Sequence, residues 1–226
     1  MLETISAFWA QYGDVLIEGS WETLLMVSIS TVLSYVIGVP LGVALIVTQP
    51  QGIRPHRVVY GVLGWIVNIG RSIPFIILLA MLFPVTRVVM GRAIGTVSVI
   101  FPLTVSAFPY VARMVEGSFN EVDNGIIEAA QSMGSSTFQI VRKVLIPEAM
   151  PSLINGFAIC MTTILGYTAM ASAAGGGGLG ALAITRGLNL RQYDVMYAAS
   201  IVLVILVQII TMLGSYFTRK FDHRIR

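Results

Sequence analysis

The sequence is short of charged residues. Asp, Glu, Lys and Arg make up only 11% of its 226 residues, against about a quarter in ordinary soluble domains. Apolar residues account for 56%, and the mean hydropathy is +0.83. So little charge with so much apolar surface excludes a soluble globular enzyme, because most of these side chains could not be kept from water. The class that remains is an integral membrane protein.

Residues that carry chemistry are also scarce. Cys160 is the only cysteine, so it can form neither an intrachain disulfide nor a thiolate metal cluster. The two histidines, His56 and His223, lie far apart in the sequence. No nucleophile with a base, acid–base pair or metal-ligand set is visible. The sequence therefore predicts no catalytic residue, no metal site and a protein that is not an enzyme.

Long apolar windows fill most of the chain. A bilayer span needs ~20 predominantly apolar residues. Four windows contain no Asp, Glu, Lys or Arg, and a fifth is interrupted only by Arg71; they cover residues 23–53, 93–112, 149–185, 195–218 and 58–86. We therefore expect an all-α integral membrane protein with five transmembrane helices in one domain, 1–226. Within it, residues 1–22 predict an amphipathic helix on the outer membrane surface, and residues 116–148 the one long cytoplasmic loop.

Basic residues between the windows are distributed unevenly. Nine fall in one alternating set of connections and only four in the other. The larger set is Arg54, Arg57, Arg113, Arg142, Lys143, Arg219, Lys220, Arg224 and Arg226, and the smaller is Arg87, Arg92, Arg186 and Arg191. Because cytoplasmic connections carry the excess of Lys and Arg, we expect the N-terminus outside and the C-terminus in the cytoplasm.

The first half of the loop at residues 116–148 has the signals of a short helix. Asp123 or Asn124 can cap its N-terminus, and apolar residues follow at helical spacing. Gly134 would end this helix in the left-handed conformation. The sequence predicts a helix that stops abruptly at a glycine turn.

A second short helix is predicted directly after that turn. Ser136 and Gln139 have the spacing of a capping box, and Pro147 is expected to end the helix. Two helices joined by a tight turn suit a groove on another protein. The alternative is an ordinary surface helix pair packed on its own spans.

A longer pattern runs through both of these helices. Glu128-Ala129-Ala130 is followed after three residues by Gly134 and, after nine more, by residues 144–147, Val-Leu-Ile-Pro. This resembles the cytoplasmic EAA loop of bacterial ABC importer permeases. The departures are Val144 for Ile and Ile146 for Leu.

Further strings narrow the resemblance to the methionine permease family of ABC importers. They are residues 71–79 (RSIPFIILL), 112–116 (ARMVE), 139–149 (QIVRKVLIPEA) and 166–170 (GYTAM). The resemblance implies the type I importer permease fold in a bacterial inner membrane. It also implies a homodimeric translocation pathway for L- and D-methionine, two cytoplasmic ATPase subunits and an external binding protein. ATP and magnesium would be bound by the ATPase, and this chain would bind no cofactor.

The resemblance and the polarity of the spans give two groups of candidate residues. Carried over from the EAA loop, the residues that would couple the permease to the ATPase are Glu128, Ala129, Ala130, Met133, Gly134 and Pro147. Polar side chains in spans tend to face a bundle interior or an aqueous cavity. Polarity and position at a span end give the translocation-path candidates Asn68, Arg71, Ser72, Asn155, Thr163, Tyr167 and Met170.

Alternative functions differ in what they require of the sequence. A permease of an ABC importer for another amino acid would share the EAA loop. An ion-coupled secondary transporter usually has carboxylates or histidines within its spans, whereas here they lie outside the windows or at their ends. A membrane enzyme would need a catalytic constellation that this sequence does not show.

Overall fold

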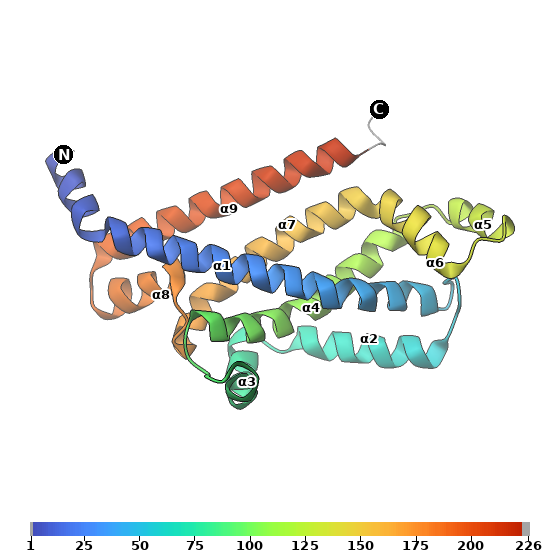
Figure 1. Cartoon of the computed structure of the whole chain (residues 1–226), viewed down its shortest axis with the longest axis horizontal. Helices are drawn as coiled ribbons and strands as arrows, with labels where there is room; N and C mark the ends of the chain where they lie inside the picture. The colour runs from blue at the N-terminus through green and yellow to red at the C-terminus, as the bar shows by residue number, and fades with distance from the viewer. Residues whose placement is uncertain (1, 223–226) are drawn as a thin grey trace. The chain divides into compact units, whose positions relative to one another are not determined.

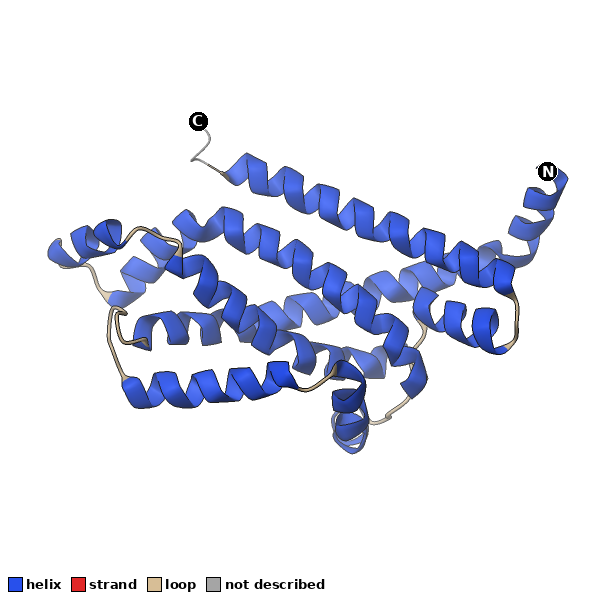
Figure 2. Cartoon of the chain, turned by 180° about the vertical axis from the view of Figure 1, so that it is seen from behind, coloured by secondary structure: helices blue, strands red, loops and turns tan. Residues whose placement is uncertain are grey.

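The computed structural model describes residues 2–222, and its side chains from Trp9 to Asp222. Helices joined by short loops make up this part of the chain (Figures 1 and 2), and no strand occurs within it. The α-helices are α1 (Leu2–Thr48), α2 (Arg57–Ser72), α3 (Phe75–Met90), α4 (Thr96–Asn120), α5 (Asn124–Ser132), α6 (Thr137–Ile140), α7 (Ile146–Ala171), α8 (Gly178–Leu182) and α9 (Tyr193–Phe221).

The chain divides into two compact units. The first comprises the residues up to Thr31, Pro74–Thr104 and Met161–Ile210. The second comprises Val32–Ile73, Val105–Cys160 and the chain from Thr211 onward. Each unit is built from segments that are distant in sequence, because the long helices contribute one part to each.

Four helical segments are long and apolar enough to cross a membrane. They are Trp9–Thr48, Thr96–Asn120, Thr137–Ala174 and Tyr193–Phe221. The pair α2 and α3 makes a fifth span if it is counted as one broken span. The all-α membrane architecture expected from the sequence is confirmed, and the count of five depends on that pair.

The expected single helix over residues 58–86 is interrupted. α2 ends at Ser72, Ile73 is extended (φ −85°, ψ 120°), and Pro74 precedes α3. Proline disfavours helical geometry in the residue before it and has no N–H to continue the ladder. The predicted window runs without a break from residue 58 to residue 86. In the structure a separate helix, α3, passes Pro84 and ends at Met90, and Gly91, which follows it, is left-handed with φ 75°.

The N-terminal helix is continuous. Where the sequence predicts a surface helix over residues 1–22 and then a span, α1 runs through both without a break. Ile17 and Trp21 are 65% and 67% exposed, whereas Leu16 is 2% exposed. Placement of residues 1–22 on the outer membrane surface stays a prediction, and the side chains of residues 1–8 lie outside the described part. So do His223, Arg224 and Arg226.

The glycine run at residues 175–178 is anchored within the first unit. The Gly178 N–H donates to Glu22 Oε2 (2.7 Å) and the Leu179 N–H donates to Thr23 Oγ1 (2.9 Å). The hydroxyl of Thr96 donates to the other carboxylate oxygen of Glu22 (2.7 Å). Two side chains of α1 therefore satisfy the N-terminal amides of α8, which no residue of α8 could do itself. The backbone of the glycine run is therefore held in place.

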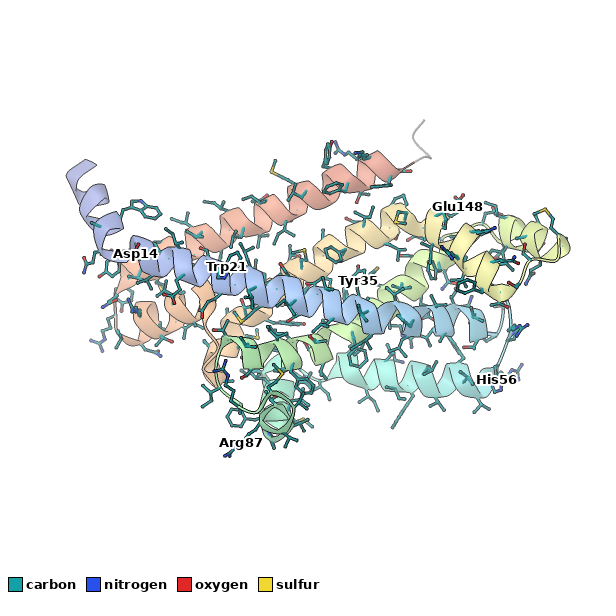
Figure 3. All side chains as sticks on the ribbon, viewed as in Figure 1. Asp14, Trp21, Tyr35, His56, Arg87 and Glu148 are labelled. Carbon is teal, nitrogen blue, oxygen red and sulfur yellow. The ribbon has the colours of Figure 1, made fainter. Side chains whose placement is uncertain are left out.

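The core of the second unit lies where α1, α2 and α4 meet. Leu45, Val67 and Ala112 are fully or almost fully buried together. Tyr35 of α1, labelled in Figure 3, donates its hydroxyl to the backbone carbonyl of Leu153 at 3.2 Å. These contacts hold α1, α4 and α7 in fixed register within this unit.

Close approach of α1 to α4 in the second unit depends on glycine. A Cβ on Gly42 would lie 2.6 Å from Cβ of Val115 and 2.7 Å from the carbonyl oxygen of Ala112. Gly38 is equally close to Val111, one turn earlier on each helix. Small residues of this kind let membrane helices pack backbone to backbone.

We expect Gly42→Ala to destabilise the purified protein by about 1–3 kcal/mol, because the added methyl group must push α4 away. Thermal unfolding in detergent measures the change. Gly61→Ala is the matched control, since a Cβ at Gly61 meets nothing within 4 Å. An unfolding temperature unchanged in Gly42→Ala would contradict the glycine-dependent packing.

Candidate functional site

The predicted cytoplasmic loop folds locally as its sequence indicates. Asp123 is the N-cap of α5, and its carboxylate accepts a hydrogen bond from the Gly125 N–H at 2.6 Å. An acceptor at this position satisfies one of the amides that a helix leaves unpaired at its start. The helix begins at Asn124, directly after the predicted cap.

Gly134 ends the first helix as predicted. Its φ is 76°, in the left-handed region that glycine adopts without steric cost. The Gly134 N–H donates to the carbonyl of Gln131 (2.9 Å), and the Ser135 N–H donates to the carbonyl of Ala130 (3.1 Å). This pair of bonds is the Schellman arrangement, which closes a helix C-terminus and turns the chain sharply.

The second helix begins as predicted and does not end where predicted. Ser136 and Gln139 form the reciprocal capping box, with bonds of 2.8 and 3.3 Å. Beyond α6 the chain forms a π-helical turn over Val141–Leu145 and continues into α7, so helix runs from Thr137 to Ala174. Pro147 therefore lies in the first turn of α7, and its predicted role as a helix stop is wrong.

The π-helical turn explains how the helix accommodates this proline. The Ile146 N–H bonds to the carbonyl of Val141, five residues back. That wider turn relaxes the backbone just before Pro147, whose ring would clash with a carbonyl in a regular α-helical ladder. Sequence periodicity does not reveal such a turn, because it changes the register by a single residue.

The coupling candidates differ in exposure. Glu128, Ala129, Gly134 and Pro147 are exposed, and Met133 is 79% exposed. Ala130 is only 5% exposed and packs inward. Phe138, which the sequence analysis did not select, is 69% exposed. Its position between the two residues of the capping box, in a helix first turn where solvent-facing residues are usually polar, was the available signal.

A cavity of about 290 Å³ lies behind α5 in the second unit. Its wall includes Ile127, Glu128 and Gln131 of α5 and the segment that follows α1. Across this wall the Gln49 amide donates to Asn120 Oδ1 at 3.1 Å. The full set of lining residues is Ile46, Gln49, Gln51, Gly52, Ile53, Phe119, Asn120, Asn124, Ile127, Glu128, Gln131 and Leu145.

Four path candidates lie in the second unit. The hydroxyl of Ser72 donates to the carbonyl of Asn68 (2.7 Å), so it serves its own helix. Arg71 is exposed, and its guanidinium makes no hydrogen bond or ion pair with the residues that the structure describes. Asn155 is exposed and lines a second cavity, of about 330 Å³, together with Glu148 (labelled in Figure 3), Glu121, Pro151, Ser152, Thr218 and Asp222.

The other three path candidates lie in the first unit, on α7. Thr163 is half-buried and Met170 is 48% exposed. The ring of Tyr167 stacks on that of Phe75, with centroids 4.7 Å apart and planes 6° from parallel. Phe75 was not selected from the sequence, since an aromatic residue at a helix start gives no sign of its partner.

Sequence reasoning also missed a polar cluster that includes Asn68. Arg113 Nη1 lies 2.6 Å from Glu116 Oε2, and Arg113 Nη2 donates to Asn68 Oδ1 at 3.0 Å. Asn68 is therefore engaged by α4, which weakens its candidacy as a path residue. Arg113 was read only as a loop cation that reports orientation. Between Trp9 and Asp222, no group of three or more His, Cys, Asp and Glu side chains could hold a metal ion.

Comparison with known proteins gives a consistent result. The family model for binding-protein-dependent transport system inner membrane components matches residues 34–226. The probable D-methionine transport system permease protein MetI of Vibrio cholerae serotype O1 is 43% identical over 221 residues, 98% of each chain. The D-methionine transport system permease protein MetI of Escherichia coli strain K12 is 50% identical over 156 residues, 69% of this chain and 72% of that one.

A solved structure shows the same fold. A chain from the inward-facing conformations of the MetNI methionine ABC transporter superposes with a TM-score of 0.93 at 45% sequence identity. The match covers 94% of this chain and 99% of that one. The type I importer permease fold expected from the sequence is confirmed.

Proposed function

Because the chain belongs to the family of binding-protein-dependent transport system inner membrane components, we propose that it is the permease subunit of an ATP-driven importer for methionine. The observation that carries the proposal is the EAA pattern on an exposed helix–glycine–helix. Its capping, glycine turn and exposed residues are those of a docking surface rather than of helices packed on their own spans.

The exposed residues of α5 and α6 form the ATPase contact. Met133 and Phe138 are large apolar side chains with 79% and 69% exposure. Isolated exposed apolar residues are common, but two on one short, rigid helix pair suit a hydrophobic cleft. Glu128, Ala129 and Gly134 lie on the same exposed helix pair, Pro147 is exposed at the start of α7, and Ala130 packs beneath α5. Closure of the ATPase on ATP then moves α5 and α6, and the spans with them.

Methionine is the proposed substrate because relatives that match 98% and 69% of this chain are named as D-methionine permeases, the first as a probable one. Both L- and D-methionine are included. Met170, 48% exposed on α7, offers a thioether for contact with such a substrate. A permease for another amino acid is the alternative, since the EAA pattern is common to both.

The assembly we propose has two copies of this chain, two cytoplasmic ATPase subunits that bind ATP and magnesium, and an external binding protein. Two copies about a two-fold axis can enclose a path that a thin bundle of spans cannot. The excess of basic residues in one set of connections supports a cytoplasmic loop at residues 116–148, a cytoplasmic C-terminus and an N-terminus outside.

Arg71 is the strongest path candidate. A guanidinium within a span is costly unless it faces water, protein or an anionic group. Arg71 is exposed and has no hydrogen-bond partner among the described residues, so it does not serve to join helices of its own chain. Contact with the aqueous path and the substrate carboxylate gives it a role. Asn68, Ser72, Asn155, Thr163, Tyr167 and Met170 remain weaker candidates.

Uptake of labelled methionine tests the function. Cells that lack their own high-affinity methionine system would express this chain with and without a cognate ATPase and external binding protein, and unlabelled amino acids would compete. We expect uptake that requires the ATPase and is displaced only by L-methionine, D-methionine or close analogues. A hydrolysis-deficient ATPase variant is the control.

Other outcomes of this assay separate the alternatives. ATPase-dependent uptake of another amino acid, with methionine inert, would retain the importer and refute the substrate. Uptake that needs no ATPase would indicate an ion-coupled transporter and refute the mechanism.

Gly134→Asp should disrupt docking on the ATPase, because it adds a charge to the exposed turn. Gly134→Asn is the matched control, since Asn and Asp tolerate left-handed backbone similarly and differ in charge. Copurification of the ATPase and its substrate-stimulated turnover measure the effect. If Gly134→Asp retains both at the level of the wild type, the turn is not part of the contact.

Arg71→Leu should lower uptake about tenfold or more while the complex still assembles, since a charge-assisted contact to the substrate is lost. Arg71→Lys should retain more activity. Arg87→Leu, which removes another exposed arginine, is the matched control. Normal uptake by Arg71→Leu in an intact complex would remove Arg71 from the path.

A further inference from the structure

A partly buried ion pair lies within one turn of α4, in the second unit, and the Arg113 side chain is 22% exposed. Arg113 Nη1 and Glu116 Oε2 are 2.6 Å apart, and Glu116 is only 5% exposed. The other carboxylate oxygen of Glu116 accepts a hydrogen bond from the Tyr60 hydroxyl at 3.1 Å. Both oxygens of the carboxylate are therefore engaged, one within α4 and one by α2.

The arginine completes the connection between the two helices. Its Nη2 donates to Asn68 Oδ1 (3.0 Å) and to the backbone carbonyl of Gly64 (3.3 Å). Tyr60, Gly64 and Asn68 are spaced four residues apart, so they lie one above another on one face of α2. A Cβ on Gly64 would lie 3.3 Å from Arg113 Nη2, so the glycine provides room for the guanidinium.

Stability alone is a poor explanation for this network. Burying the Glu116 carboxylate costs free energy that its attraction to Arg113 often fails to recover, and a well-packed apolar pair can serve as well. The same helices already meet in an apolar core at Leu45, Val67 and Ala112. The polar contacts add directionality: five residues in two helices must keep their positions, which fixes α2 against sliding or rotating on α4.

The position of the network in the chain indicates its purpose. Glu116 lies one turn before α4 ends at Asn120, and α5 begins at Asn124. On the other side, α2 continues from Asn68 to Arg71, the strongest path candidate. The network is therefore the polar link between the helix that leads into α5 and the helix that carries Arg71.

We propose that Arg113 and Glu116 are positioning residues that transmit movement of α5 and α6 to α2. The pair contacts neither substrate nor ATPase. It makes α2 follow α4 when the ATPase closes, so that Arg71 moves in step with ATP hydrolysis. This inference rests on the proposed function of the chain.

The test is the amount of labelled L-methionine taken up per ATP hydrolysed by the complete complex in proteoliposomes. In Glu116→Gln the charge is lost while the side chain keeps its size, and we expect the ratio to fall about tenfold with ATP hydrolysis and assembly retained. Tyr60→Phe removes only one hydroxyl, so it should fold even if Glu116→Gln fails to fold. It should lower the ratio of methionine taken up to ATP hydrolysed by less than Glu116→Gln does. Glu116→Asp should recover part of the loss.

Gly117→Ala is the matched control. It lies beside Glu116 on α4, and a Cβ there meets nothing within 4 Å, so the ratio should equal that of the wild type. An unchanged ratio in both Glu116→Gln and Tyr60→Phe would overturn the inference and leave the proposed function standing. The inference would also be overturned if uptake and ATP hydrolysis fell in proportion in these variants and the complex no longer assembled, because the pair would then have only a structural role. A wild-type complex that takes up no methionine with ATP would overturn both.

Discussion

The requirement that every polar group find a partner in apolar surroundings governs this structure. A backbone in hydrocarbon must satisfy its own N–H and C=O groups, and helices do so within one segment. Many polar side chains obey the same rule, although the hydroxyls of Thr86 and Thr218 are buried without a hydrogen-bond partner among the residues that the structure describes. The hydroxyls of Thr23, Thr31 and Thr48 each donate to the carbonyl four residues earlier in α1, at 2.6–2.8 Å. A hydroxyl in a span is therefore a weak indication of a water-filled path.

Side chains of one helix also satisfy polar groups of another helix. Glu22 and Thr23 of α1 accept hydrogen bonds from the first amides of α8. Arg113 reaches from α4 to α2. In both places a polar side chain connects segments that are far apart in sequence, and each connection lies within one of the two compact units. These directional contacts fix the register between neighbouring helices, which apolar packing alone would allow to slide past each other.

Local features could be predicted from the sequence, and long-range ones could not. The cap at Asp123, the left-handed Gly134 and the capping box of Ser136 depend on neighbouring residues only, and all three are present. The break at Ile73 escaped notice because the apolar window runs through it. At Pro147 the sequence predicted a helix end that is absent, because a π-helical turn lets the helix continue through the proline. Asn68 and Phe75 acquired their partners through tertiary packing that no periodicity records.

The π-helical turn over Val141–Leu145 also has a mechanical consequence. Helix continues on both sides of this turn, so a movement of α6 is transmitted directly to α7. A turn with one extra residue is wider and less well bonded than the turns beside it, so this helix would bend there first. The continuous helix from Thr137 to Ala174 is therefore stiff along most of its length and has one defined point of bending, about one turn from the exposed surface of α6.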